Sequence, residues 1–84
     1  MKKTNDFEKY LAAKSDKELV SIVAEEYTDS GLSRDELVEA GMDGIAKAHE
    51  KYDTKQGYSF NAYAVWWVRQ RILQSINSSN DEQK

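Results

Sequence analysis

The chain has 84 residues and a net charge of −3, with no cysteine and no proline. A chain of this length can form one small domain, and the lack of cysteine excludes a disulfide framework and a thiolate metal site. No signal-peptide core and no stretch that could span a membrane are visible in the sequence, so we expect a soluble protein of the reducing cytoplasm. Lys, Ala and Glu are among the most frequent residues and glycine occurs only four times, which favours helix over sheet.

Start signals predict two helices in the first part of the chain. The pattern at residues 5–8 predicts a short helix that runs to about Lys14. Ser15 and Glu18 then form a capping-box pattern, in which each side chain accepts a hydrogen bond from the other residue's backbone amide. The helix that this box opens is expected to end near Gly31.

Two further helices are predicted after this boundary. Ser33 and Glu36 form a second capping box, and the helix that they open should end before a loop at residues 53–57. Ser59 caps a last helix that runs to about Ser78. No internal repeat separates these elements, so a compact bundle is the simplest architecture.

These signals predict an all-α fold, a small helical bundle of three main helices plus a short N-terminal helix. We expect one domain over residues 1–84, with a polar and frayed tail at 79–84. Gly41 and Gly44 lie inside the third expected helix, where a glycine costs about 1 kcal/mol relative to alanine. A close approach between helices is the reason that we expect for this pair.

The last expected helix is apolar or aromatic on two sides. At about 100° per residue, one side carries Val65, Val68, Ile72 and Ile76, and the other carries Tyr63, Trp66, Trp67 and Gln70. A bundle of this size can bury only one side fully, so a second partner is expected for the other. We therefore predict that at least one tryptophan is substantially exposed. The alternative is that both tryptophans complete a small core.

Charge is distributed unevenly along the chain. Residues 1–56 carry 9 basic and 13 acidic side chains, whereas residues 57–79 carry Arg69 and Arg71 and no acid. Aromatic rings stack on unpaired bases at about 1–3 kcal/mol each, arginine attracts phosphate, and glutamine can read a base edge. The aromatic segment therefore predicts a surface for single-stranded nucleic acid on an otherwise acidic protein.

The same segment resembles a known family. The run Gly57-Tyr58-Ser59-Phe60, followed by Tyr63-Ala64-Val65-Trp66-Trp67-Val68-Arg69-Gln70, is similar to the promoter-melting and minus-ten-reading segment of primary-type sigma factors. Residues 19–32 resemble the preceding helix of region 2 of the bacterial RNA polymerase sigma-70 family, and residues 35–53 resemble its middle helix. The resemblance covers about residues 16–78 in unbroken order. It implies one module of a transcription initiation factor, because the family's later domains have no counterpart in these 84 residues.

The resemblance implies DNA-binding roles for the aromatic segment. Tyr63 matches the family tyrosine that stacks on the flipped adenine of the minus-ten element. Trp66 and Trp67 match the paired tryptophans that wedge against the last intact base pair. Gln70 matches the residue that reads the first pair of the element. The full expected DNA-binding set is Tyr58, Phe60, Tyr63, Trp66, Trp67, Arg69 and Gln70.

The resemblance also implies partners. The RNA polymerase core would bind through the clamp helices of its largest subunit, and promoter DNA would bind mainly as the single-stranded non-template strand. An anti-sigma protein is a further candidate partner. The expected polymerase-binding residues lie on the middle helix and are Asp35, Val38, Glu39, Met42 and Asp43. No cofactor and no metal are expected.

Departures from the family pattern support a second hypothesis. Ala40, Met42 and Asp43 stand where the family has residues that meet the polymerase clamp, and Glu25 and Glu26 stand where it commonly has lysines. A sigma-derived regulatory module, which competes for polymerase or for an anti-sigma protein with little DNA binding, would fit these changes. An enzyme is not expected, because the sequence has one histidine and no nucleophile–base set.

Overall fold

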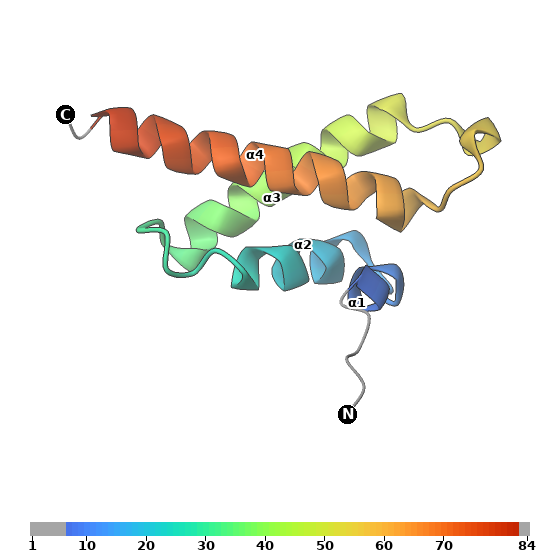
Figure 1. Ribbon diagram of the computed structural model, residues 1–84, viewed down its shortest axis with the longest axis horizontal. Helices are drawn as coiled ribbons and strands as arrows, with labels where there is room; N and C mark the ends of the chain where they lie inside the picture. The colour runs from blue at the N-terminus through green and yellow to red at the C-terminus, as the bar shows by residue number, and fades with distance from the viewer. Residues whose placement is uncertain (1–6, 83–84) are drawn as a thin grey trace.

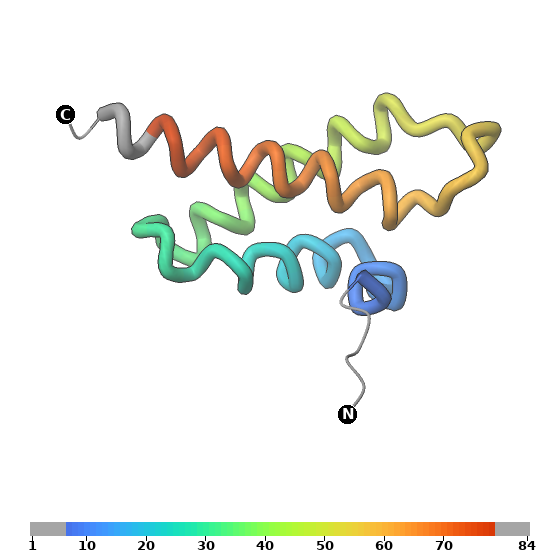
Figure 2. The backbone as a smooth tube through the Cα atoms, in the orientation of Figure 1, coloured from blue at the N-terminus to red at the C-terminus, as the bar shows by residue number. Residues whose placement is uncertain are grey.

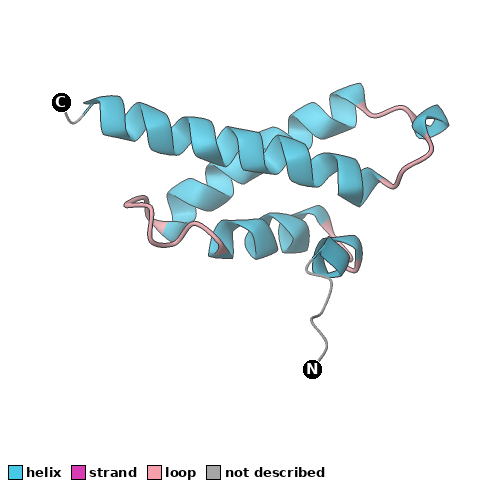
Figure 3. Cartoon of the chain, viewed as in Figure 1, coloured by secondary structure: helices cyan, strands magenta, loops and turns pink. Residues whose placement is uncertain are grey.

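The computed structural model describes the backbone of residues 7–82 and the side chains of residues 7–78. Within this range every regular element is helical (Figure 3). The elements are α1 (Phe7–Leu11), α2 (Asp16–Glu25), α3 (Arg34–Lys51), the 3-10 helix η1 (Thr54–Gln56) and α4 (Phe60–Glu82). The predicted all-α fold, with three main helices and a short N-terminal one, is confirmed.

The helices α3 and α4 form a crossed hairpin around which the rest of the chain packs (Figure 1). The tube in Figure 2 shows the chain reversing direction between them at one end of the molecule, through the segment that contains η1. The helix α2 contacts both α3 and α4, and α1 contacts α2 and α4. Aromatic residues that follow α3 meet aromatic residues at the start of α4 at this end of the hairpin, next to η1.

The core lies where α2, α3 and α4 face one another. Its largest fully buried side chains are Leu19, Val20, Val23, Leu37, Val68 and Ile72. The predicted inward side of the last helix is confirmed, because Val65, Val68 and Ile72 are buried and Ile76 packs against the core. Burial of such aliphatic side chains contributes about 1.5–3 kcal/mol each, which makes this layer the main source of stability.

The two predicted capping boxes differ in the structure. At Ser33 the box is complete, because the Glu36 amide donates to Ser33 Oγ at 3.1 Å and the Ser33 amide donates to Glu36 Oε1 at 2.8 Å. At Ser15 only half of it forms. The Glu18 amide donates to Ser15 Oγ at 3.1 Å, but the Glu18 carboxylate accepts from the Lys14 amide at 3.0 Å. That carboxylate still satisfies a backbone donor ahead of α2, one residue earlier than expected.

Helix ends are where the sequence prediction was least accurate. α2 ends at Glu25, well before Gly31. The backbone amides that follow donate to carbonyls three residues back instead of four, as the Tyr27 amide does to Ala24 O at 2.9 Å. The expected start of the first helix at Asn5 lies outside the described residues. The expected frayed tail at 79–84 is wrong over residues 79–82, since α4 continues to Glu82. No proline or glycine interrupts that segment, so helix propagation is not stopped there.

The early end of α1 has a tertiary cause. α1 ends at Leu11 rather than near Lys14, and the side-chain amide of Asn61 on α4 lies against carbonyl groups at and just beyond this end. Asn61 Nδ2 lies 2.9 Å from Tyr10 O, 3.1 Å from Ala13 O and 3.3 Å from Leu11 O. One amide from a distant helix therefore caps the C-terminus of α1 and fixes it against α4.

Gly41 and Gly44 permit the close approach of helices that the sequence predicted. A Cβ atom on Gly44 would lie 2.6 Å from the carbonyl oxygen of Trp67 and 2.8 Å from Val68 Cα, both in the backbone of α4. A Cβ atom on Gly41 would lie 2.6 Å from Val20 Cγ1. The backbones of α3 and α4 are thus in contact at Gly44, which sets the position of Trp67 directly.

Candidate nucleic-acid interface

An aromatic cluster joins the end of α3 to the first half of α4. It consists of Tyr52, Tyr58, Phe60, Tyr63, Trp66 and Trp67. Tyr52 is central to it, with its ring centroid 5.4 Å from that of Phe60 and 5.6 Å from that of Tyr63. Tyr58 stacks on Tyr63 at 5.8 Å, and the two tryptophan rings meet edge to face at 5.1 Å. The rings therefore form one continuous surface rather than isolated side chains.

The loop between α3 and α4 places Tyr58 in this cluster. Asp53 Oδ1 accepts from the Lys55 amide at 2.9 Å and opens η1, and Gly57 ends it with a φ of 88°. Glycine adopts this left-handed conformation without steric cost. The Tyr52 hydroxyl then donates to the Tyr58 carbonyl at 2.6 Å, which ties the loop back to the end of α3.

Tyr52 is a member of the cluster that the sequence reasoning missed. It is absent from the DNA-binding set that the sequence led us to expect. Its position immediately before the loop, six residues ahead of Tyr58, was the available signal. Only the reversal of the chain brings its ring between Phe60 and Tyr63.

Exposure of the cluster is uneven. Trp66 is 56% exposed and Tyr58 is 43% exposed, so the prediction of at least one exposed tryptophan is confirmed. Trp67 is half-buried, and its Nε1–H is buried without a hydrogen-bond partner among the described residues. Tyr58, Ala62, Tyr63 and Trp66 line an open, almost entirely apolar hollow of about 340 Å³. A flat aromatic ring is the kind of group that such a hollow can accept.

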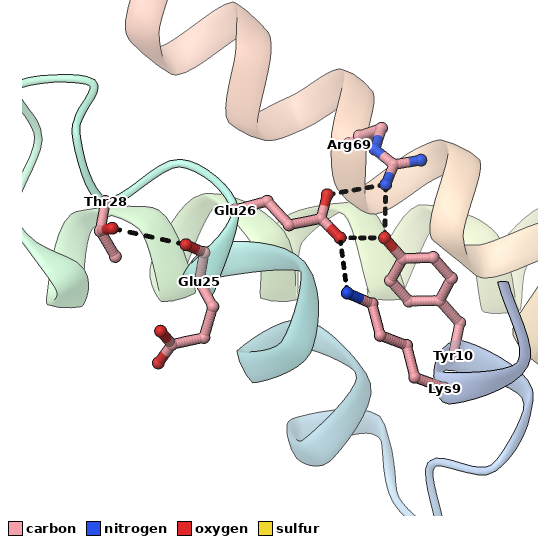
Figure 4. A network of polar contacts seen from close by, with 6 residues as sticks. All are labelled: Lys9, Tyr10, Glu25, Glu26, Thr28 and Arg69. Atoms are coloured by element: carbon pink, nitrogen blue, oxygen red, sulfur yellow. Dashed lines mark hydrogen bonds and ion pairs between the residues drawn. The ribbon is translucent and has the colours of Figure 1, made fainter. Parts of the chain in front are cut away.

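Arg69 is held in an internal network of polar contacts between three helices (Figure 4). Its Nη2 lies 2.6 Å from the Tyr10 hydroxyl and 2.7 Å from Glu26 Oε1. The Tyr10 hydroxyl also donates to Glu26, and Lys9 Nζ lies 3.7 Å from the same carboxylate. Arg71 in turn pairs with Asp43 at 3.2 Å. Both arginines of the aromatic segment are thus engaged by acids of the protein itself.

The other residues of the expected binding sites lie on α3 and α4. Gln70 is half-buried and lies one helical turn beyond Trp66 on α4. Four residues of the expected polymerase-binding set are exposed on α3, namely Asp35, Glu39, Met42 and Asp43. Val38 differs from them, because it is half-buried and packs against the core.

Comparison with known protein families agrees with the resemblance that the aromatic segment of α4 carries. The family model described as Sigma-70 region 2 matches residues 13–81 of the chain. The chain belongs to the sigma-70 region 2 family. The resemblance read from the sequence over about 16–78 is therefore confirmed.

Sigma factors are also among the relatives of this region 2 domain. It is 43% identical over 58 residues to the RNA polymerase sigma factor SigA of Nostoc sp., which covers 69% of this chain and 15% of that protein. It is similar to the SigA of Microcystis aeruginosa at 43% identity over 58 residues, which covers 69% of this chain and 14% of the relative. The chain thus spans about one seventh of the length of these relatives.

Two further features of the domain concern binding chemistry. His49 Nε2 lies 2.8 Å from Asp16 Oδ2, and the imidazole stacks on Phe60 at 4.3 Å, so the single histidine links α3 to α2 and α4. Across the described range there is no group of three or more His, Asp or Glu side chains arranged to hold a metal ion. No helix within that range is long and apolar enough to cross a membrane.

The network around Arg69 shifts the pKa values of its members. Burial and the hydrogen bond to Glu26 raise the pKa of Tyr10 to about 12. Burial alone would raise the pKa of Glu26, but the hydrogen bonds from Arg69 and Tyr10 outweigh it and lower that pKa below its usual range. Burial would lower the pKa of Arg69, and the hydrogen bond to Glu26 raises it instead. The network is therefore stable as a charged pair with a neutral tyrosine.

A loss of stability at alkaline pH is the expected consequence. In the unfolded chain Tyr10 ionises near its ordinary pKa of 10.0, but in the folded domain it stays neutral to about 12. Its contribution is complete below pH 10 and is lost as the pH rises through 12, by roughly 1–3 kcal/mol. Urea unfolding at pH 8 and pH 11.5 measures this change. Tyr10→Phe should show a smaller decrease between the two pH values, and an equal decrease would contradict the assignment.

Proposed function

We propose that this region 2 domain is a transcription initiation module that binds the RNA polymerase core and recognises and melts the minus-ten promoter element. The observation that carries the proposal is the exposed Trp66 at the rim of the apolar hollow lined by Tyr58 and Tyr63. Membership of the sigma-70 region 2 family supports it, as do relatives that are named RNA polymerase sigma factors. The domain acts in the cytoplasm as a binding module, without catalysis.

The hollow is the proposed site for an unpaired base. Extraction of a base from the duplex costs a few kcal/mol, and stacking on aromatic rings offsets that cost. Tyr58 and Tyr63 already stack nearly parallel, with 24° between their planes, so little ring movement is needed to accept a base beside them. The hollow presents few polar atoms, which favours a flat ring over a phosphate or a sugar.

The order of residues along α4 fits a junction between single and double strand. Gln70 lies seven positions after Tyr63, which corresponds to about 10 Å along the helix, or roughly three base steps. Tyr63 would stack on the extracted base, Trp66 and Trp67 would wedge against the last intact pair, and Gln70 would read a base edge beyond it. Tyr58 and Phe60 would line the path of the strand.

We propose that the polymerase supplies the positive charge for phosphate contacts that this domain lacks. Because Arg69 and Arg71 are engaged by Glu26 and Asp43, few cations are left for phosphate contacts near the aromatic cluster. Arg69 accordingly serves to position α4, rather than to attract phosphate as expected from its sequence. Weak binding to free DNA is expected for a domain with a net charge of −3. The exposed residues of α3, Asp35, Glu39, Met42 and Asp43, are the proposed contacts to the clamp helices.

The regulatory module remains a second candidate function. The observation that favours it is the same pairing of both arginines, together with the acidic, exposed surface of α3. Under this proposal the domain competes for polymerase or for an anti-sigma protein, and the aromatic cluster contributes little to its activity.

Tryptophan fluorescence separates the two candidates. A minus-ten-type single strand is titrated at low salt, with a scrambled strand of equal composition as the control. Sequence-dependent quenching is expected, because bases would stack beside Trp66 and Tyr63. The absence of any change, both for the free domain and for the domain bound to polymerase core, would contradict the promoter-melting proposal and favour the regulator.

A further inference from the structure

His49 is the one histidine of the chain, and it belongs to neither of the proposed binding surfaces. It lies in the last turn of α3, and its side chain is 57% exposed. The imidazole stacks on the ring of Phe60, with 4.3 Å between the ring centroids and 25° between the planes. Phe60 is the first residue of α4 and a member of the aromatic cluster. The histidine therefore packs against this cluster at the point where α4 begins.

A carboxylate from a third helix holds the imidazole. Asp16 is the first residue of α2, and its Oδ2 atom lies 2.8 Å from His49 Nε2. Because a carboxylate accepts hydrogen bonds and an imidazole N–H donates them, Nε2 is the donor. A negative charge is also favoured at the N-terminus of a helix, which makes Asp16 a well-placed anchor. His49 is thus tied to α2 while its ring lies on the first residue of α4.

Phe60 connects this restraint to the rings that line the hollow. Its ring meets that of Tyr52 edge to face at 5.4 Å, with 86° between the planes. Tyr52 in turn lies 5.6 Å from Tyr63, which lines the hollow. Aromatic pairs in such arrangements attract each other beyond the effect of their buried area. The rings from His49 to Tyr63 therefore form an unbroken series of contacts.

We infer that His49 is a positioning residue for the proposed DNA-binding surface. It holds Phe60, and through Phe60 the ring of Tyr52, in the arrangement that receives the unpaired strand. Rings that are ordered before binding lose less conformational freedom when bases stack on them, so this preorganisation raises affinity. The inference rests on the proposed binding of minus-ten DNA, and it adds a residue that acts on that binding through its neighbours.

Replacement of the imidazole tests this role. His49→Ala is expected to raise the Kd for a minus-ten single strand about threefold to tenfold, because the cluster loses one ring contact. His49→Phe should recover most of this loss, since it keeps a flat ring on Phe60 and lacks only the anchor to Asp16. Fluorescence anisotropy of a labelled strand, with polymerase core present, measures the Kd. Circular dichroism checks that each variant folds.

Glu50→Ala is the matched control on the same helix. Glu50 follows His49 directly, its side chain is 64% exposed, and its carboxylate pairs with Lys47 at 3.2 Å. Loss of this surface ion pair should leave the Kd for the strand within about twofold of wild type.

A double variant shows whether His49 acts through Phe60. Phe60→Leu removes the ring and keeps an apolar side chain at the start of α4. In that background His49→Ala should have no further effect on the Kd, because the ring that it holds is already gone. Fully additive losses would mean that His49 acts by another route, which overturns the inference.

The outcomes separate the inference from the proposal on which it rests. If combined replacement of Tyr63 and Trp66 by alanine weakens binding but His49→Ala does not, the DNA-binding surface is right and the positioning role is wrong. Equal weakening by His49→Ala and His49→Phe would assign the effect to the charge or to the hydrogen bond rather than to the ring, which also overturns the inference. If the wild-type domain does not bind the strand even with polymerase core present, both statements fall.

Discussion

Replacement of both Tyr63 and Trp66 by alanine is expected to weaken binding of a minus-ten single strand by at least about 30-fold. Each aromatic ring contributes about 1–3 kcal/mol to stacking on a base, and both rings line the same hollow. Trp66→Ala alone should account for much of the loss with little change in stability, because its side chain is 56% exposed. Fluorescence anisotropy of a labelled strand, with polymerase core present, measures the affinity without relying on the tryptophans.

Two variants serve as controls for this result. Tyr63→Phe keeps the ring and should retain most of the affinity. Leu11→Ala removes an apolar side chain that is 45% exposed on α1, outside the aromatic cluster, and should leave binding unchanged. Wild-type affinity of the double alanine variant would show that the aromatic cluster is not the DNA-binding surface.

Gly44→Ala is expected to lower the free energy of unfolding by about 1–3 kcal/mol. The added methyl group would lie 2.6 Å from the carbonyl oxygen of Trp67 and 2.8 Å from Val68 Cα, so α3 and α4 must move apart. Alanine gains about 1 kcal/mol in helix propensity over glycine, which offsets only part of this cost. Urea unfolding followed by circular dichroism measures the difference.

Gly41→Ala provides the matched comparison on the same helix. There the three atoms nearest to the added methyl group all belong to side chains, with Val20 Cγ1 at 2.6 Å and Val68 Cγ1 at 3.2 Å. Side chains can rotate where backbone cannot, so the loss at position 41 should be the smaller of the two. Equal or greater stability of Gly44→Ala relative to wild type would be incompatible with the backbone contact between α3 and α4.

DNA binding should also respond to Gly44→Ala. The backbone of Trp67 is what the new methyl group would displace, and its ring contacts both Trp66 and Tyr63. Packed helices move as units, so a small displacement of α4 at this point shifts the rings that line the hollow. A stability loss together with weaker strand binding would link the glycine of the core to the aromatic surface.

The sequence by itself determined the features that depend on neighbours along the chain. The capping box at Ser33 was predictable because its two partners are three residues apart. The inward side of α4 and the exposure of at least one of its tryptophans followed from helical periodicity and from the small core that a chain of this length can build, whereas the structure identified the exposed ring as that of Trp66. The aromatic run Tyr63–Gln70 identified the family for the same reason, since it is a local pattern.

Only the tertiary structure decided the features that join distant segments. Glu26, 43 residues away at the C-terminal cap of α2, pairs with Arg69, and no pattern in the sequence indicated this contact. Asn61 ends α1, and Tyr52 enters the aromatic cluster only because the loop reverses the chain. A groove lined by Met42 of α3 and Gln74 of α4 likewise exists only because these two helices pack against each other. Hydrogen bonds, ion pairs and grooves of this kind depend on how helices pack, and neither periodicity nor propensity contains that information.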